Sequence, residues 1–342
     1  MRVAPGSIPL KNIVLSWYIF WLSPLSVKLQ QLKYIVEVCR HNNHFSDAAD
    51  HLHTSQPGLS KQIQMLEAEL GYAIFLRNRN RILGLTAPGR EIVEIAKRVI
   101  MDVESMKSVQ ANLAAQTHGA LTIATTHTPA RYVLPDVVQR FVKRYPDVRV
   151  GLRQGNPAQI CAMVDEGTAD IAIGSETSQQ FPGLVMIPCF ELARSIVARR
   201  GHPILRVKRP SLEQLAKYPI ITNDPSFSGR WRVMEAFNKR GLSPRFMFGI
   251  VDADVSKAYV ERNLGIAILP TMAVESAREM NLRGRDISHL FPPSTIYVTL
   301  RKNAYLRQFV FDFITSLSPT LTTAAITAAL RGKKRAASRV AG

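Results

Sequence analysis

The sequence has few of the residues that disulfide frameworks, zinc sites and hydrolytic centres require. Only three of its 342 residues are cysteines; they are far apart, odd in number and without a Cys/His spacing that suits zinc. This fits a reducing cytoplasm, and small buried side chains are the expected role of Cys39, Cys161 and Cys189. No nucleophile-elbow, zinc-protease or phosphate-loop motif is present. We therefore predict no enzyme activity, no catalytic residue, no metal and no cofactor.

Carboxylates are also scarce, with 26 Asp and Glu against 44 Lys and Arg and a formal net charge of +18. Such a surplus favours an anionic partner, most commonly nucleic acid. It is not concentrated near the start, because residues 28–118 carry 11 basic and 9 acidic side chains. The basic tail, residues 321–342, either adds non-specific DNA affinity or only keeps the protein soluble. Charge alone does not locate a DNA-binding surface.

Long apolar runs are absent apart from one near the start, NIVLSWYIFWLSPLSV, residues 12–27. It is short for a membrane span, ends at Ser23-Pro24, and no small-x-small cleavage site follows. A signal peptide, an anchor and a genuine extension are the alternatives. The favoured interpretation is that residues 1–26 come from a mis-called start and that translation begins at Val27. No membrane partner is expected.

The segment after Val27 predicts a helix-turn-helix. Apolar residues at helical spacing indicate a first helix from Lys28, and Ser46 is the expected N-cap of a short second helix. A third helix lies within HTSQPGLSKQIQMLEAELG, with Pro57 in its first turn and Gly71 just past its end. Its apolar face consists of Leu59, Ile63, Leu66 and Leu70. The opposite, polar face is then presented to the major groove of DNA.

A basic hairpin is predicted directly after this helix, in YAIFLRNRNRILGLT, residues 72–86. Two short β-like runs flank a tip that contains Arg77, Arg79 and Arg81. Arginines at a hairpin tip suit backbone phosphates or the minor groove. A charge run is by itself also typical of a solvated loop, but its position after a helix-turn-helix favours a DNA-binding wing. The DNA-binding domain is thus expected over residues 27–86.

A long helix is expected over residues 87–117, capped by Thr86 and with Pro88 in its first turn. Its heptad positions are mostly apolar and fall at residues 92, 96, 99, 103, 106, 110 and 113. This spacing indicates a coiled-coil dimerisation helix, and a dimer would match a two-fold operator. Packing of the same face on its own domain is the alternative.

From His118-Gly119 onward, strands and helices alternate. ADIAIGSE and LGIAILP are strand-like, and helical stretches such as PDVVQRFVKRYP separate such segments. This alternation predicts parallel sheets with helices on both faces, in two successive sets. Two α/β lobes suggest a cleft between them, which is a usual place for a small ligand.

The segment FSDAADHLHTSQPGLSKQIQMLEAELGYAIFLR, followed by LTAPGREI, resembles the DNA-binding domain of LysR-type transcriptional regulators. Further stretches, among them KLQQLKYIVEV, LVMIPC and DADV, are similar to the CysB-like subgroup, and the resemblance covers about residues 27–325. It implies an α/β fold with an N-terminal all-α winged helix-turn-helix, a linker helix and a two-lobed, periplasmic-binding-protein-like effector domain over residues 118–320. Lobe I would take about 120–188 with 270–320, and lobe II about 189–269.

The resemblance implies a cytoplasmic, homotetrameric activator of sulfur-assimilation and cysteine-biosynthesis genes, assembled as a dimer of dimers. Its partners would be double-stranded promoter DNA, RNA polymerase and a small anionic effector: acetylserine, sulfate or thiosulfate. A paralogue that controls the use of sulfonates is the alternative. An exported solute-binding protein is a distant one, because such a receptor needs no winged helix at residues 28–116.

Carried over position by position, the resemblance implies DNA contacts around the start of the third helix. The expected set is Thr54, Ser55, Gln56, Pro57, Ser60, Lys61 and Gln64. Gln56, Ser60 and Lys61 are favoured within it. Lys61 stands where arginine is common in the family, so it keeps donors for guanine or phosphate but lacks the planar fork.

Two expected helix starts in the ligand-binding part suit an anion, with Thr128 as one N-cap and Ser228 just before the other helix. Most such residues merely cap helices. The resemblance implies effector contacts through the hydroxyls of Thr126, Thr128, Ser175 and Ser228. Pro129 replaces a glutamine of that pattern and removes an amide and a backbone donor. The chemistry of the effector therefore stays open between acetylserine, sulfate and sulfonates.

Four histidines cluster near the helix-turn-helix: His41, His44, His51 and His53. A metal site and a pH switch are the alternatives to solvated or hydrogen-bonded side chains. Nothing in the sequence fixes their geometry, so the plainer role is expected.

Overall fold

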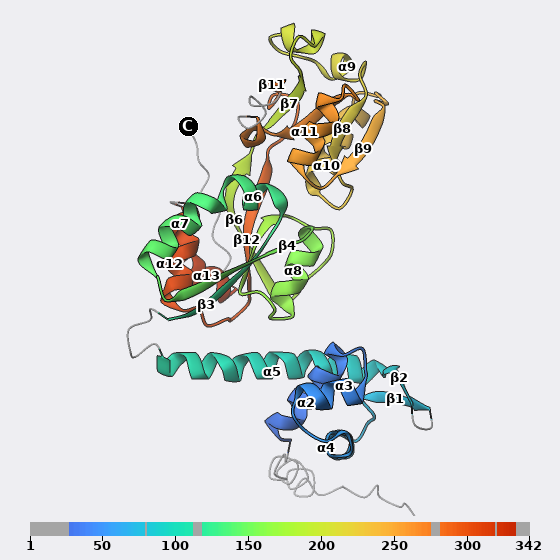
Figure 1. Cartoon of the computed structure of the whole chain (residues 1–342), viewed down its shortest axis with the longest axis vertical. Helices are drawn as coiled ribbons and strands as arrows, with labels where there is room; N and C mark the ends of the chain where they lie inside the picture. The colour runs from blue at the N-terminus through green and yellow to red at the C-terminus, as the bar shows by residue number, and fades with distance from the viewer. Residues whose placement is uncertain (1–26, 79–80, 112–117, 275–280, 319, 333–342) are drawn as a thin grey trace, which may run out of the picture. The chain divides into compact units, whose positions relative to one another are not determined.

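The computed structural model describes residues 27–78, 81–111, 118–274, 281–318 and 320–332 (Figure 1). It divides into two compact units, Met1–Glu104 and Ser105–Gly342. The expected extension, Arg79, heptad position 113 and residues 333–342 of the basic tail lie outside the described ranges. Within those ranges no helix is long and apolar enough to cross a membrane.

The first unit contains three short helices, a two-stranded wing and most of a long helix. In chain order these elements are α2 (Leu29–Arg40), α3 (Phe45–His51), α4 (Gln56–Leu70), β1 (Phe75–Asn78), β2 (Arg81–Leu85) and α5 (Ala87–Ala111). Leu59, Ile63 and Leu66 of α4 are fully buried. They share one core with the inner faces of α2 and α3 and with Val93 and Ala96 of α5. The predicted apolar face of α4 therefore holds the unit together.

Helix α4 is capped at both ends, and the glycine at its C-terminal end is the cap expected from the sequence. Ser55 is the N-cap and its Oγ accepts a hydrogen bond from the Gly58 N–H at 3.2 Å. Gly71 follows the last turn with a φ of 80°, a conformation that glycine adopts without strain. The expectation for α3 was wrong, because this helix begins at Phe45 with His44 as N-cap, before Ser46.

The wing is fixed to the long helix by the LTAPG motif. Thr86 Oγ1 donates to the Ala73 carbonyl at 2.7 Å and accepts from the Gly89 N–H at 2.8 Å. A Cβ on Gly89 would lie 2.0 Å from the Ile74 carbonyl oxygen, so only glycine allows this approach. The predicted cap at Thr86 is thus present, and it also positions the hairpin β1–β2.

The heptad face of α5 is divided between two environments. Ala96 is buried in the core of its own unit, whereas Val99 and Met106 are exposed, Met106 by 69%. The alternative of packing within the domain therefore holds for the first turns. Dimerisation through the rest of the face stays a prediction.

The second unit has two lobes, each with a five-stranded sheet. In lobe I the strand order is β4-β3-β5-β12-β6. Its strands are β3 (Gly119–Thr125), β4 (Val148–Gln154), β5 (Ile171–Ser175), β6 (Leu184–Leu192) and β12 (Ser294–Arg301). Its helices are α6 (His127–Tyr132), α7 (Leu134–Arg144), α8 (Pro157–Asp165), α12 (Gln308–Leu317) and α13 (Thr323–Leu330).

Lobe II has the strand order β11-β7-β10-β8-β9. Its strands are β7 (Arg194–Arg199), β8 (Ile220–Asn223), β9 (Phe246–Ile250), β10 (Ile266–Pro270) and β11 (Leu282–Asp286). Its helices are η1 (Pro203–Arg206), α9 (Leu212–Leu215), α10 (Ser228–Asn238) and α11 (Ala253–Glu261), with η2 (Thr271–Ala273) directly after β10.

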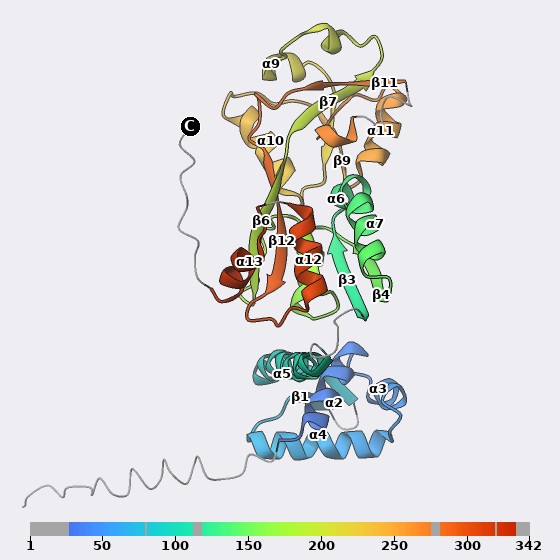
Figure 2. The ribbon, with the colours of Figure 1, turned by 90° about the vertical axis from the view of Figure 1, so that its left-hand side faces the viewer.

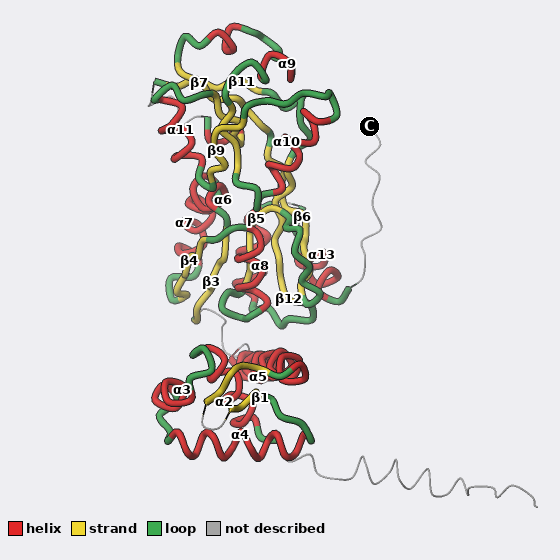
Figure 3. Tube along the Cα trace, turned by 90° about the vertical axis from the view of Figure 1, so that its right-hand side faces the viewer, coloured by secondary structure: helices red, strands yellow, loops and turns green. Residues whose placement is uncertain are grey.

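Helices cover both faces of each sheet, as the alternation predicted. In lobe I, α12 and α13 lie on one face (Figure 2) and α8 on the other (Figure 3). In lobe II, α10 packs on one side and α11 on the other. The prediction that residues 321–342 form a basic tail is partly wrong, because Ile326 and Leu330 of α13 are buried in the lobe I core.

Each sheet is mixed rather than wholly parallel. Strands β4-β3-β5 and β10-β8-β9 run parallel, while β12, β6, β7 and β11 pair antiparallel. The antiparallel strands are those next to the two places where the chain passes between lobes. They also correct the expected limits of lobe II, since β6 up to Leu192 belongs to lobe I and β11 belongs to lobe II.

Candidate DNA interface and effector cleft

The polar face of α4 borders a groove on the first unit. Gln56, Ser60 and Gln64 lie at four-residue intervals, so they share one side of the helix, and all three line the groove together with Arg77 of the wing. The turn before α3 and the first two residues of that helix also line the groove, from Asn42 to Ser46. The structure thus brings together four of the residues predicted to contact DNA.

The other predicted residues of the helix start have different surroundings. Lys61 is exposed one position beyond Ser60, and Pro57 is exposed in the first turn. The Ser55 hydroxyl is engaged as the N-cap, and Thr54 is half-buried before it. Lys61 is the basic residue of α4, and its contact with phosphate stays a prediction.

Arg77 of the wing is tied to helix α4. Its Nη2 lies 2.8 Å from Glu67 Oε2, while Glu67 Oε1 accepts from the N–H groups of Ile74 and Phe75 at 2.8 and 3.1 Å. Glu67 was not among the residues predicted from the sequence. It lies in the segment LEAELG, residues 66–71, where α4 ends. It sets the position of the wing relative to α4, and Arg77 contributes to that role. Arg81 begins β2, and DNA contacts from the wing stay a prediction.

A narrow cleft of about 30 Å³ lies between the two lobes of the second unit. Lobe I lines it with polar residues that include Thr126, Thr128 and Ser175, and lobe II contributes Arg194 and Asn223. Three of the four predicted effector residues therefore meet here. Ser228 is buried beside the cleft, and its neighbours Phe227 and Gly229 form the wall.

The helix starts differ slightly from those expected. Helix α6 begins at His127 with Thr126 as N-cap, so the prediction of Thr128 as N-cap was wrong. Proline fits any of the first helical positions, and Pro129 is simply the third residue of α6. Ser228 is itself the first residue of α10, after Phe227. The first turns of both helices still line the cleft, through Thr128 of α6 and Gly229 of α10.

Arg194 is the main feature of the cleft that sequence reasoning missed. It is the first residue of β7 and is only 3% exposed. Burial, and to a lesser extent the nearby Arg232 guanidinium, lowers the pKa of Arg194 to about 10, so the side chain stays charged at neutral pH. Its Nη2 donates to Ser294 Oγ at 2.5 Å, and none of the ion pairs among the described residues involves it. A buried cation without a carboxylate partner suits an anionic ligand.

Two further observations support an anion at this place. Arg194 Nε and Ser175 Oγ are buried and have no hydrogen-bond partner among the described residues. A Cβ on Gly229 would lie 2.8 Å from Arg194 Nη2 and 3.0 Å from Asn223 Nδ2. Glycine at this position therefore lets the first turn of α10 approach both donors, and its N–H groups add to their attraction for negative charge.

Side chains of α6 and α11 connect the lobes beside the cleft. Asp254 of α11 accepts from Tyr132 OH at 2.7 Å and lies 3.3 Å from Arg131 Nε and 2.5 Å from Lys257 Nζ. Asp252, the N-cap of α11, lies 2.9 Å from His127 Nε2. Helix α6 thus contributes Thr128 to the wall of the cleft, and its other side chains, among them His127 and Tyr132, contact α11 of lobe II.

Two family profiles match the chain. Residues 29–90 match the bacterial regulatory helix-turn-helix protein, lysR family, and residues 114–321 match the LysR substrate binding domain. The chain belongs to the LysR family of transcriptional regulators. It is accordingly a DNA-binding regulator with a small-molecule-binding domain and not an enzyme.

Relatives of this LysR regulator agree with the resemblance seen in the sequence. The transcriptional regulator CysB of Burkholderia cenocepacia is 43% identical over 90% of this chain and 98% of its own length. The regulator SsuR of the same organism is 40% identical over 89% of this chain and 99% of its own length. The solved cofactor-binding domain of the Cbl regulator is 36% identical, with a TM-score of 0.60 over 63% of this chain and 95% of that chain. The predicted family and fold are confirmed.

The predicted DNA contact of Lys61 in this LysR regulator can be tested by substitution. We expect Lys61→Ala to weaken operator binding about tenfold at moderate salt and to reduce the salt slope by about 1, because one phosphate or guanine contact is lost. The measurement is fluorescence anisotropy on an operator fragment selected by the wild type, over a range of salt concentrations. Lys143→Ala, which removes an exposed lysine from α7, is the matched control. An unchanged affinity and slope for Lys61→Ala would show that the assignment is wrong.

Proposed function

We propose that this LysR-family regulator controls genes of sulfur assimilation or sulfonate use in response to a small anionic effector. The observation that carries the proposal is the buried, charged Arg194 in a cleft lined with hydroxyls. The choice of sulfur-containing effectors rests on the similarity to CysB, SsuR and Cbl regulators.

In the proposed complex, the anion lies between the lobes. Arg194 supplies charge and donors, and the hydroxyls of Thr126, Thr128 and Ser175 supply neutral donors from lobe I. The first turn of α10, beginning at Ser228, supplies backbone N–H groups from lobe II. Donors from both lobes would bind the anion better when the lobes are close, which is the differential affinity that a switch requires.

The proposed assembly uses the exposed part of the α5 heptad face. Val99 and Met106 are exposed in the single chain, and covering them with a second α5 would form a coiled-coil dimer. Two such dimers would form the tetramer, placing four winged helices on promoter DNA in the cytoplasm. A change in lobe closure would then alter the spacing of the DNA-binding pairs, the DNA bend and the contact with RNA polymerase.

Pro129 keeps the sulfonate alternative in the proposal. It is buried near the start of α6 and has no N–H to donate. A ligand that needs an additional amide donor at this position is therefore less well served. Sulfate and sulfonates present three or more equivalent oxygens, which the remaining donors can satisfy.

A thermal-shift titration tests the proposed effector. The full chain would be titrated separately with N-acetylserine, O-acetylserine, sulfate, thiosulfate and a set of sulfonates, with chloride at equal ionic strength as control. We expect the unfolding midpoint to rise with the concentration of at least one sulfur oxyanion or acetylserine, because a ligand that binds the native state stabilises it. Stabilisation by acetylserines would favour a cysteine regulator, and by sulfonates alone a regulator of alternative sulfur sources. No shift with any of them would remove the support for an anionic sulfur effector.

A further inference from the structure

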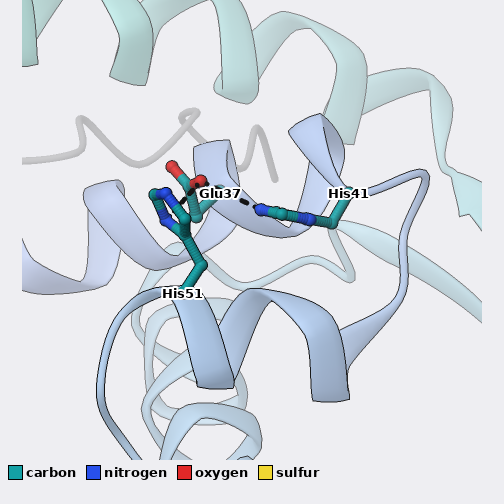
Figure 4. Close-up of side chains that lie close together, drawn as sticks. All are labelled: Glu37, His41 and His51. Atoms are coloured by element: carbon teal, nitrogen blue, oxygen red, sulfur yellow. Dashed lines mark ion pairs between the residues drawn. The ribbon is translucent and has the colours of Figure 1, made fainter.

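Three side chains of the first unit meet at a point that the proposed regulatory cycle does not use. Glu37, His41 and His51 direct their polar ends toward one another (Figure 4). Glu37 Oε1 lies 3.3 Å from His41 Nε2 and 2.9 Å from His51 Nδ1. The three potential ligand atoms all lie within 4.8 Å of one another. Two of the four histidines that cluster in the sequence near the helix-turn-helix are thus in a defined arrangement.

The backbone builds this arrangement. Glu37 and His41 are four residues apart at the end of α2, so they share one side of it. Asn42 and Asn43 follow with φ values of 53° and 65°, a left-handed conformation that asparagine tolerates better than most residues. This turn sends the chain back along α2, and His51 at the end of α3 returns to Glu37.

The spacing is close to that of a zinc site. With Zn–N and Zn–O bonds of about 2.0–2.2 Å and tetrahedral angles, neighbouring ligand atoms lie about 3.3–3.5 Å apart. The contacts to Glu37 are 2.9 and 3.3 Å, so small movements of the imidazoles would suffice. The His51 side chain is 62% exposed and can move, while that of Glu37 is only 10% exposed. Arg40 Nη1 lies 3.3 Å from Glu37 Oε2 and orients the carboxylate from outside the cluster.

We propose that Glu37, His41 and His51 form a binding site for Zn²⁺ in the DNA-binding unit. Two imidazoles and one carboxylate favour zinc and its first-row neighbours over Ca²⁺ and Mg²⁺, which prefer oxygen ligands. Both imidazoles are in contact with solvent, so water takes the fourth coordination position of the zinc ion. The ion joins α2 to α3, the two helices whose core residues pack with Ile63 of α4. Zinc therefore stabilises the framework that presents the recognition helix.

The test measures zinc binding by the full, tag-free chain in competition with a chromophoric chelator. We expect His51→Ala to lose the site or to weaken it at least about 100-fold, because one of three protein ligands is removed. His44→Ala is the matched control: this exposed imidazole lies in the same unit, caps no helix through its side chain and is outside the cluster. It should bind zinc like the wild type.

A second group of possible ligands, His127, Asp252 and Asp254, lies in the other unit. Zinc binding is therefore also measured for the variant His127→Asn. Any zinc that this variant no longer binds belongs to the second group. With Co²⁺ in place of zinc, the visible absorption of a four-coordinate ion should appear in the wild type and in His44→Ala but not in His51→Ala. His51 is exposed, so its variant should remain folded, as far-UV circular dichroism would verify. Equal zinc affinity in His51→Ala and wild type, or no zinc binding by the wild type, would overturn the proposal.

Discussion

Replacing Arg194 with methionine is expected to weaken effector binding by about 2–4 kcal/mol, roughly 30- to 700-fold in Kd. The bound anion would lose its charged partner in a site where water cannot replace it. Methionine keeps most of the length of the side chain, so the packing around β7 is largely preserved. The measurement is isothermal titration with the effector that the thermal-shift series identifies.

A second readout separates a binding role from a structural one. Because burial lowers the pKa of Arg194 to about 10, the native state without ligand holds this charge at a cost. Arg194→Met should therefore leave the unfolding midpoint unchanged or raise it, while the shift produced by ligand disappears. Arg199→Met, at the exposed end of the same strand, is the matched control and should bind effector normally. Normal binding by Arg194→Met would show that the anion lies elsewhere.

The features of the fold that could be predicted from the sequence are those that depend on residues close together in the chain. Pro57 in the first turn of α4, the glycine at 71 and the cap at Thr86 each act within one helical turn, and each is present in the structure. The apolar faces follow from periodicity in the same way. These local rules were enough for the helices of the first unit and for the alternation of strands and helices in the second.

Arg194 could not be predicted because its role depends on contacts between segments far apart. In LARSIVAR it reads as a charged residue at a strand end, which is usually solvated. It becomes buried because Ser294 and the first turn of α10 close over it from positions 100 and about 35 residues further along. The antiparallel strands were missed for a similar reason, since β12 returns to lobe I only after lobe II is complete.

The proposed zinc site could be predicted only in part, because two of its ligands are close in the sequence and the third is not. Glu37 and His41 have the spacing of two ligands on one helical turn, and this is visible in the sequence. The third ligand depends on two successive left-handed residues, Asn42 and Asn43, whose φ values no periodicity reveals. A turn of this kind decides which of His44, His51 and His53 faces Glu37, and the structure selects His51.

The contacts between α6 and α11 limit how the lobes can move. Lys257 is only 2% exposed, and its Nζ lies 2.5 Å from Asp254 Oδ1. The same carboxylate accepts a hydrogen bond from Tyr132 of lobe I, so one anion serves both the fold of lobe II and its contact with lobe I. Any ligand-driven change of the cleft must preserve or replace these bonds.

Removing this carboxylate is expected to destabilise the second unit strongly. Asp254→Ala should lower the free energy of unfolding by about 3 kcal/mol, because the buried Lys257 ammonium loses a charged partner. This is the low end for a buried pair, since the Asp254 side chain is 38% exposed. The measurement is urea unfolding of the full chain followed by tryptophan fluorescence. Glu235→Ala is the matched control: its pair with Lys239 has a similar distance, 2.7 Å, but both side chains are more than 60% exposed. It should leave the midpoint of urea unfolding close to that of the wild type.

Two further measurements test the cause of that loss. The double variant Asp254→Ala, Lys257→Met should recover much of the stability, because no buried charge is left unpaired. In the wild type, desolvation would raise the pKa of Asp254, but hydrogen bonds from Lys257 and Tyr132 and the attraction of Lys257 lower it overall. Its contribution should therefore be complete above the ordinary carboxyl pKa of about 4 and disappear as the pH falls below it. Equal losses in Asp254→Ala and Glu235→Ala at neutral pH would mean that Lys257 finds another partner and that Asp254 does not hold the lobes together.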